Sequence, residues 1–164
     1  MKRLKLILLS LFVVGGQVVG ATSCGPQIGN CEYYKCLGQE LNCASDSMIL
    51  KTAAPNCGAY EKDHSKFSLQ AQTVLKRLKS CLQNQVEQAQ SLRCEAAGND
   101  FVQAHVKCYL SQGFCQLPIG DKLHIGRIGF AGLRHAAFRR AAIEILEECG
   151  DTDLLSTIDF KTVR

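Results

Sequence analysis

The chain has 164 residues, with ten cysteines, no tryptophan and a formal net charge of +4 at pH 7. Three of its basic residues lie within the first five positions, and without them 16 basic residues stand against 15 acidic ones. This near balance, together with the absence of tryptophan, gives little support for nucleic-acid binding. The length suits one domain with a modest core.

The first 21 residues have the pattern of a secretory signal peptide. A basic start is followed by the apolar run 6–14, and the small residues Val-Gly-Ala end it at 19–21. The apolar run is far shorter than the roughly 20 residues that span a bilayer, and no second such run follows, so no membrane span is expected. We predict cleavage after Ala21 and a secreted, extracellular product over 22–164, periplasmic if the source is bacterial. Lipidation of Cys24, which the preceding residues loosely suggest, would leave an odd number of cysteines.

Helical periodicity is clearest over Phe67–Ala89. Apolar residues recur there at helical spacing and polar residues occupy the other face. Ser65 or Ser68 can cap the start, and Cys81 lies on the apolar stripe. Upstream, a short helix is predicted between Ser45 and Ala54, stopped by Pro55.

Further helices are predicted in the second half of the chain. One runs over Asp100–Gln112, with Asn99 as its cap and Gly113 as its stop. The stretch Gln116–Gly126, which contains proline and glycine, reads as a loop.

A third helix is predicted from about Ile128 to Cys149, ending at Gly150, and a short one after Asp151. Strand alternation is not evident over any useful length. The predicted fold class is therefore all-α, a single small helical domain stapled by five disulfides.

The cysteines are the most informative residues of the sequence. An even number of them in an exported chain indicates a disulfide framework, here of five bridges. Ten cysteines allow roughly 900 pairings, so spacing alone does not choose among them. They are Cys24, Cys31, Cys36, Cys43, Cys57, Cys81, Cys94, Cys108, Cys115 and Cys149.

Residues that could bind metal occur without a recognised spacing. His105 and Cys108 lie one helical turn apart, and His124 and His135 follow in sequence. No Cys-x-x-Cys pair is present, so we expect bridges rather than a zinc site. His135 is expected to be a hydrogen-bonded core histidine.

Catalytic and calcium-binding motifs are also missing from the sequence. There is no Gly-x-Ser-x-Gly, no cysteine in a protease-like context and no EF-hand loop. Asp46, Asp151 and Asp153 are expected to cap helices rather than to bind calcium. We therefore expect neither a cofactor nor an enzymatic activity.

A basic cluster offers one possible binding site. It could bind a sulfated glycan or an acidic partner, and it consists of Arg127, Arg134, His135, Arg139 and Arg140. The neighbouring acidic residues favour the alternative of a solvated helix surface whose charges compensate one another: Glu144, Glu147 and Glu148.

Four stretches of the sequence resemble the stanniocalcins, a family of secreted helical glycoprotein hormones. They are YYKCLGQELNC, KFSLQAQTVLKRLKSCL, RCEAAGNDFVQAHVKCYLSQGFC and ILEECGDTDLLSTI. The resemblance extends from Cys24 to about Ile158. Gaps of 23, 13 and 6 residues, after Cys57, Cys94 and Cys108 respectively, equal those of the family.

The resemblance implies a pairing scheme and a function. The implied bridges are Cys24–Cys36, Cys31–Cys57, Cys43–Cys94, Cys81–Cys108 and Cys115–Cys149, the first three anchoring a glycine-rich amino-terminal segment. The implied function is that of a secreted regulator that binds a protein receptor or target and acts in calcium and phosphate homeostasis. The alternative is a secreted disulfide-rich effector, inhibitor or adhesion module without hormone activity. Because the ten cysteines can all pair internally, any homodimer is expected to be non-covalent.

Overall fold

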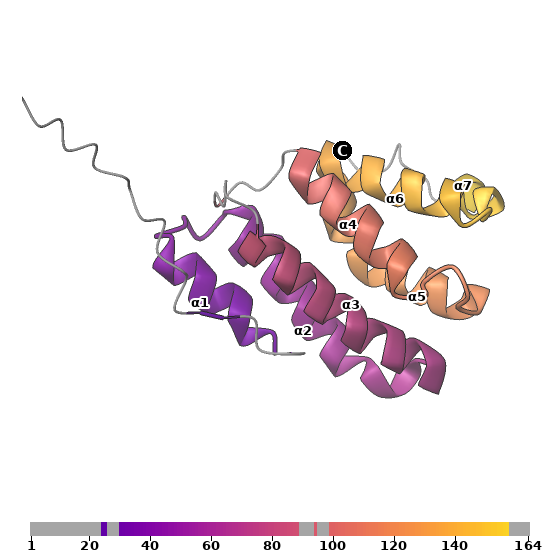
Figure 1. Cartoon of the computed structure of the whole chain (residues 1–164), viewed down its shortest axis with the longest axis horizontal. Coiled ribbons are helices and arrows are strands. Elements are labelled where there is room, and N and C mark those ends of the chain that lie inside the picture. The colour runs from indigo at the N-terminus through magenta and orange to yellow at the C-terminus, as the bar shows by residue number, and fades with distance from the viewer. Residues whose placement is uncertain (1–23, 26–29, 89–93, 95–98, 158–164) are drawn as a thin grey trace, which may run out of the picture.

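The computed structural model describes residues 24–25, 30–88, 94 and 99–157. In these residues it has seven α-helices and no strand, so the predicted all-α class is confirmed (Figure 1). The predicted signal peptide and its cleavage point lie outside the described residues. The helical elements in chain order are α1 (Glu32–Glu40), the π-helical turn η1 (Ile49–Ala53), α2 (Ala54–Lys62), the 3₁₀ turn η2 (His64–Lys66), α3 (Leu69–Gln88), α4 (Asn99–Ser111), α5 (Ile119–Gly129), the 3₁₀ turn η3 (Phe130–Arg134), α6 (Ala136–Glu148) and α7 (Thr152–Thr157).

The two helices with the clearest sequence patterns form as predicted. Ser68 caps α3, its Oγ accepting a hydrogen bond from the backbone N–H of Ala71 at 3.2 Å. After α4, Gly113 takes a positive φ of 94°, and the next N–H donates back to the carbonyl of Tyr109 at 3.2 Å. This is the hydrogen-bonded stop that glycine favours.

The end of α6 and the short α7 are also confirmed. Gly150 has a φ of 74°, and the N–H of Asp151 donates to the carbonyl of Leu146 at 2.8 Å. The same glycine stop therefore separates α6 from α7.

The prediction of one helix over Ile128–Cys149 is wrong. The chain bends through η3, and His135 has extended backbone angles (φ −84°, ψ 128°) before α6 begins. The guanidinium of Arg139 donates to the carbonyls of Leu133 and Arg134 at 2.8 and 2.9 Å. Those carbonyls end η3, so the side chain stabilises the break that periodicity did not reveal.

The predicted loop over Gln116–Gly126 is likewise wrong, because α5 occupies most of it. Pro118 is the residue just before this helix, where a proline fits. Glycines lower the intrinsic helical propensity of the segment but do not prevent a helix that tertiary contacts hold.

Pro55 does not stop a helix. The chain passes from η1 directly into α2, with this proline in the first turn of α2. The first turn does not need the missing N–H. The prediction also missed α1 entirely, although Tyr33, Tyr34 and Leu37 are buried on one face of it.

The larger core lies among α3, α4, α5 and α6. Figure 1 shows α4 between α3 and α6, and both pairs are in contact. The buried residues of this core are Phe67, Ala71, Val74, Leu75, Leu78, Val102, Val106, Cys108, Phe114, Leu117, Ile125, Ala137, Ala141, Ile145 and Leu146. Only one of the fifteen is a cysteine, so this core is aliphatic and aromatic.

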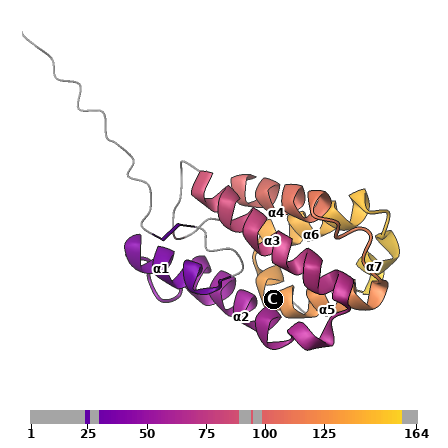
Figure 2. The same cartoon turned by 60° about the horizontal axis from the view of Figure 1, so that its bottom comes forward.

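A second, smaller core lies among α1, η1 and α2, beside the bundle (Figure 2). Its buried residues are Cys24, Cys31, Tyr33, Tyr34, Leu37, Ile49, Ala54 and Cys57. Two hydrogen bonds link it to α3: Tyr33 Oη donates to Glu87 Oε1 at 3.0 Å, and Gln83 Nε2 donates to the carbonyl of Asn30 at 2.9 Å. Burial, followed by the bond to Glu87, raises the pKa of Tyr33 well above its usual value.

Candidate interaction surface

All ten cysteines form intrachain disulfides. The pairs are those that the stanniocalcin resemblance implies: Cys24–Cys36, Cys31–Cys57, Cys43–Cys94, Cys81–Cys108 and Cys115–Cys149. Their Cα atoms lie 5.0 to 5.7 Å apart, which is within the usual range for a disulfide.

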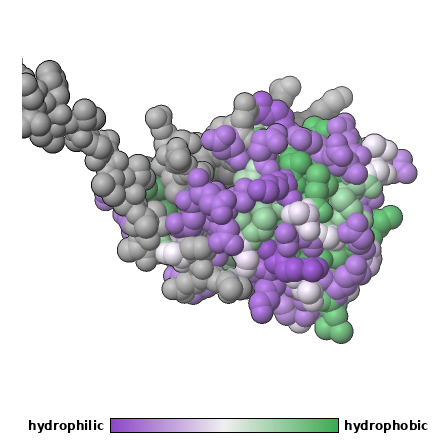
Figure 3. Space-filling view, in the orientation of Figure 1, coloured by the Kyte–Doolittle hydropathy of each residue, from purple (hydrophilic) through white to green (hydrophobic). Residues whose placement is uncertain are grey.

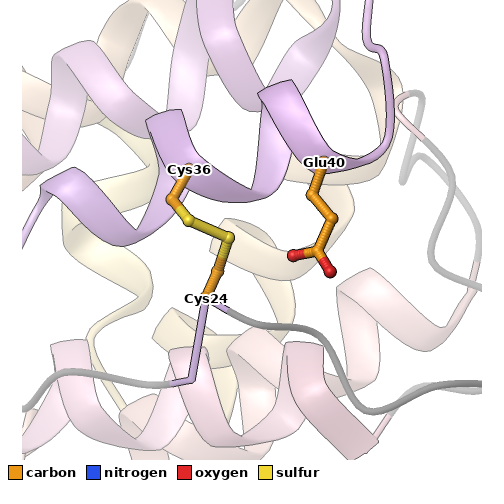
Figure 4. Close-up of side chains that lie close together, drawn as sticks. All are labelled: Cys24, Cys36 and Glu40. Atoms are coloured by element: carbon orange, nitrogen blue, oxygen red, sulfur yellow. A yellow bond between two sulfur atoms is a disulfide. The ribbon is translucent and has the colours of Figure 1, made fainter.

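Two groups of sulfur and carboxylate atoms lie close enough to suggest metal ligands. In one, the sulfurs of Cys24 and Cys36 lie within 4.8 Å of a carboxylate oxygen of Glu40, and Figure 4 shows the two sulfurs bonded to each other. The other consists of Cys31, Cys57 and Glu61. A disulfide sulfur is not a thiolate and does not bind zinc as one. The same holds for Cys108 beside His105, because Cys108 is bonded to Cys81.

The three histidines that could have bound a metal have different surroundings. His135 is exposed, so the prediction that it belongs to the core is wrong; it stands at the extended residue before α6, where its side chain faces solvent. His105 lies edge-on to Phe138, with ring centroids 5.4 Å apart. His124 Nε2 lies 3.0 Å from Asp63 Oδ2.

The side chain of Asp63 links η2 to α5 by contacts with Lys66 and His124. Hydrogen bonds from Lys66 and then from His124 hold the pKa of this carboxyl below its usual value. The ring of His124 also lies edge-on to Phe67, with centroids 4.6 Å apart.

The predicted basic cluster is only partly realised. Arg127, Arg134, His135 and Arg140 are exposed, whereas Arg139 is half-buried and caps η3. In the described part of the chain no ion pair joins these residues to the acidic residues that follow on α6. The charges therefore make no direct ion pair there, and the compensated, solvated surface stays a prediction.

Polar contacts on its inner side fix α5 to the bundle. The carboxylate of Asp121 accepts from the Ser68 N–H at 3.1 Å and from its Oγ at 2.6 Å. Lys122, whose side chain is only 5% exposed, donates to Asp151 Oδ2 at 2.6 Å and to the Cys115 carbonyl at 2.7 Å. Asp151, the residue just before α7, thus pairs with a buried lysine.

The outer side of α5 carries large apolar side chains that contact solvent. Ile119, Leu123 and Phe130 are 59%, 42% and 41% exposed. Spacings of four and seven residues place them on one face of α5 and its continuation η3. The bonds between Ser68 and Asp121 bring the 81%-exposed Leu69, at the start of α3, to the same end of the molecule. We call Leu69, Ile119, Leu123 and Phe130 the α5 surface.

Two glycines leave part of the α5 backbone without side-chain cover. Gly120 and Gly126 are exposed within α5, and a Cβ added to either would meet nothing within 4 Å. Arg127 is the exposed charged residue on the same helix. Hydrophobic surface is visible in Figure 3 along the right and lower edges, where Figure 1 places α5 and the start of α3.

One local feature of the sequence points to this surface. Ile119 and Leu123 are apolar residues one helical turn apart. Pro118 and the glycines of the same segment nevertheless predict a loop. Nothing local connects them with Leu69, because the contact that brings α3 and α5 together is tertiary.

Comparison with known proteins yields no match: neither a family model, nor a curated protein, nor a solved structure is significantly similar to this chain. Among the described residues, none of the helices combines the length and the apolar character that crossing a bilayer requires.

Proposed function

We propose that the chain is a secreted regulatory protein of the stanniocalcin type, which acts by binding another protein. The pairing of all ten cysteines supports this, because such dense bridging is typical of small extracellular proteins. The pairs also equal those implied by a resemblance that covers most of the sequence. A role in calcium and phosphate homeostasis follows from that resemblance.

The α5 surface is the observation that carries the proposal. Clustered large apolar side chains on a small domain mark contact sites for other molecules. Each glycine in a helix costs roughly 0.5–1 kcal/mol relative to alanine, and among the described residues a Cβ at Gly120 or Gly126 would meet no atom within 4 Å. A partner that approaches the helix backbone closely would explain both features.

Binding rather than catalysis fits the chemistry of the described residues. Every cysteine is in a bridge, so no thiolate nucleophile is available. The side chains of the α5 surface are apolar and have no acid–base chemistry.

A second candidate is an effector, inhibitor or adhesion module on the same scaffold. It is favoured by the absence of any Asn-x-Ser/Thr triplet in the sequence and by the absence of a free thiol that could link two chains. Both candidates use a protein partner, and they differ in what the partner does.

The test begins with the full chain expressed under its own amino-terminal segment in a secreting animal cell line. We expect the protein in the medium, beginning at Thr22, and saturable binding of the labelled protein to cultured epithelial cells. Ile119→Asp with Leu123→Asp should weaken that binding by about tenfold or more, since buried apolar anchors dominate interfaces. Gln39→Asp with Gln103→Asp adds the same charge at exposed sites elsewhere and should leave binding unchanged.

Two results would overturn the proposal. One is retention of the chain inside the cells. The other is equal binding by the two double variants, which would show that the α5 surface is not the contact site. A change in calcium or phosphate uptake by the epithelial cells supports the hormone-type function, whereas binding without such a change supports the effector.

A further inference from the structure

An open groove runs along α3, beyond the end of the helix that carries Leu69. Its volume is about 470 Å³. Seven residues of α3 and one residue directly after α4 line it: Lys76, Arg77, Ser80, Cys81, Asn84, Gln85, Gln88 and Gln112.

The lining follows from the helical repeat. Positions 76, 80, 84 and 88 form one row with a spacing of four, and 77, 81 and 85 form the adjacent row. The floor includes Cys81, which the bridge to the fully buried Cys108 ties to α4. The groove therefore lies on a part of the fold that is covalently fixed.

Two cations and four amides supply most of the polar groups that line the groove. Lys76 and Arg77 are exposed, and no carboxylate is among the lining residues. The guanidinium of Arg77 reaches toward the turn after α4: a Cβ built on Gly113 would lie 3.8 Å from Arg77 Nη2. At the other helix, Lys107 Nζ lies 3.4 Å from Gln85 Oε1 and adds a third cation at the groove edge.

We propose that this α3 groove binds a polyhydroxylated oxyanion, of which a sulfated saccharide is the first candidate and a phosphorylated polyol the second. Lys and Arg form the strong, charge-assisted hydrogen bonds that sulfate and phosphate oxygens accept. The four amides can each donate to and accept from hydroxyl groups.

The composition of the lining argues against macromolecular ligands of other kinds. A protein partner needs apolar anchor pockets, and the groove contains no aliphatic or aromatic side chain. A single-stranded nucleic acid needs aromatic stacking platforms, which are absent from the same lining.

The experiment uses the full oxidised protein and three probes in titration calorimetry at about 0.15 M salt. They are a heparin-derived hexasaccharide, inositol hexakisphosphate and a hyaluronan hexasaccharide, which has carboxylates but no sulfate. We expect binding of the sulfated or the phosphorylated probe, and the tighter of the two identifies the source of the oxyanion. Hyaluronan should bind at least about tenfold more weakly.

Two double variants test the site, and a third serves as the control. Lys76→Gln with Arg77→Gln should weaken binding by about tenfold or more, whereas Arg134→Gln with Arg140→Gln makes the same change in net charge on another surface and should weaken it less than about twofold. Asn84→Asp with Gln88→Glu, which is nearly isosteric, should abolish binding by placing carboxylates in the groove. All six residues are exposed, so the melting temperatures should not change.

Equal loss in the two arginine-containing variants would overturn the proposal, because the attraction would then come from overall charge. Undiminished binding by the carboxylate variant, or no binding of any probe by the unaltered protein, would overturn it as well. These outcomes are independent of binding at the α5 surface.

Discussion

The amino-terminal unit of α1, η1 and α2 and the bundle of α3 to α7 differ in what fills their interiors. Three of the eight buried residues in the smaller core are cysteines, against one of fifteen in the larger. Three of the five disulfides have an end in or beside the smaller core: Cys24–Cys36, Cys31–Cys57 and Cys43–Cys94.

This difference shows what the bridges do in each part. A short segment cannot bury enough apolar surface to offset the entropy of ordering it, so covalent links supply the missing stability. The bundle has enough aliphatic side chains to fold around, and there the bridges add to an existing core. The two units should therefore respond differently when bridges are removed.

The largest effect is expected from replacing the six cysteines of the amino-terminal bridges by serine. Each bridge contributes about 2–4 kcal/mol to the free energy of unfolding, so α1 and η1 should lose the protection of their amides from hydrogen exchange. The helices α3, α4 and α6 should keep theirs. Protection of α1 that survives the substitution would show that the smaller core is stable on its own.

Replacing Cys81 and Cys108 by alanine should lower the free energy of unfolding of the bundle by about 2–4 kcal/mol. The helices should nonetheless remain formed, because the aliphatic core around them persists. Denaturant unfolding followed by circular dichroism measures both. Loss of all helical signal without denaturant would mean that the bundle depends on its bridges as much as the amino-terminal unit does.

The next largest loss of stability is expected from breaking the buried ion pair of the bundle. Asp151→Asn leaves the Lys122 ammonium, 5% exposed, without its counter-charge, and should cost about 3 kcal/mol of unfolding free energy. The matched change in the amino-terminal unit is Glu32→Gln, which breaks an exposed pair with Lys35 and should cost less than about 0.5 kcal/mol. Chemical denaturation of both variants gives the comparison, and equal losses would contradict it.

The parts of the fold that sequence predicts are those fixed by local contacts. α3 has a long, uninterrupted apolar repeat and a serine cap, and Gly113 and Gly150 stop helices through backbone geometry that glycine favours. These features need no knowledge of distant residues.

The missed parts depend on contacts between distant segments. α5 forms despite its glycines because Asp121 and Lys122 bond to groups on α3 and after α6. Leu69, the fourth residue of the α5 surface, is brought to the same end of the molecule only by the tertiary bonds between Ser68 and Asp121. The row of polar residues along the α3 groove can be seen in the sequence, since it repeats every four residues along one helix. Gln112, which completes the lining, comes from after α4 and is placed there only by the tertiary fold.

A smaller, pH-dependent effect should appear at the junction of the two units. The lowered pKa of Asp63 means that its contribution to stability is present above the unfolded pKa, near 3.8, and is lost as the pH falls through the lower folded value. Urea unfolding midpoints of the unaltered protein and Asp63→Asn should differ near neutral pH and converge toward about pH 2. Asp46→Asn, in an exposed turn, is the control for removing a carboxyl group and should leave the midpoint near neutral pH almost unchanged. A pH-independent difference for Asp63→Asn would contradict the assignment.

The smallest expected effect compares two helical glycines, one in each unit. Gly58 in α2 and Gly126 in α5 are both exposed, and a Cβ added to either meets nothing within 4 Å. Alanine at either position should therefore stabilise the protein by about 0.5–1 kcal/mol, which corresponds to a rise of roughly 3 °C in melting temperature. Calorimetry should give similar rises for the two variants.

We expect the cell-binding assay to distinguish Gly126→Ala from Gly58→Ala, although the two variants should have similar melting temperatures. A methyl group on the α5 surface keeps a partner from approaching the helix backbone, so Gly126→Ala should weaken cell binding while Gly58→Ala leaves it unchanged. If both variants bind as well as the unaltered protein, Gly126 is retained for no reason connected with that surface. If Gly126→Ala instead lowers the melting temperature, the open space beside it is filled in solution, and the surface is already covered within the folded chain.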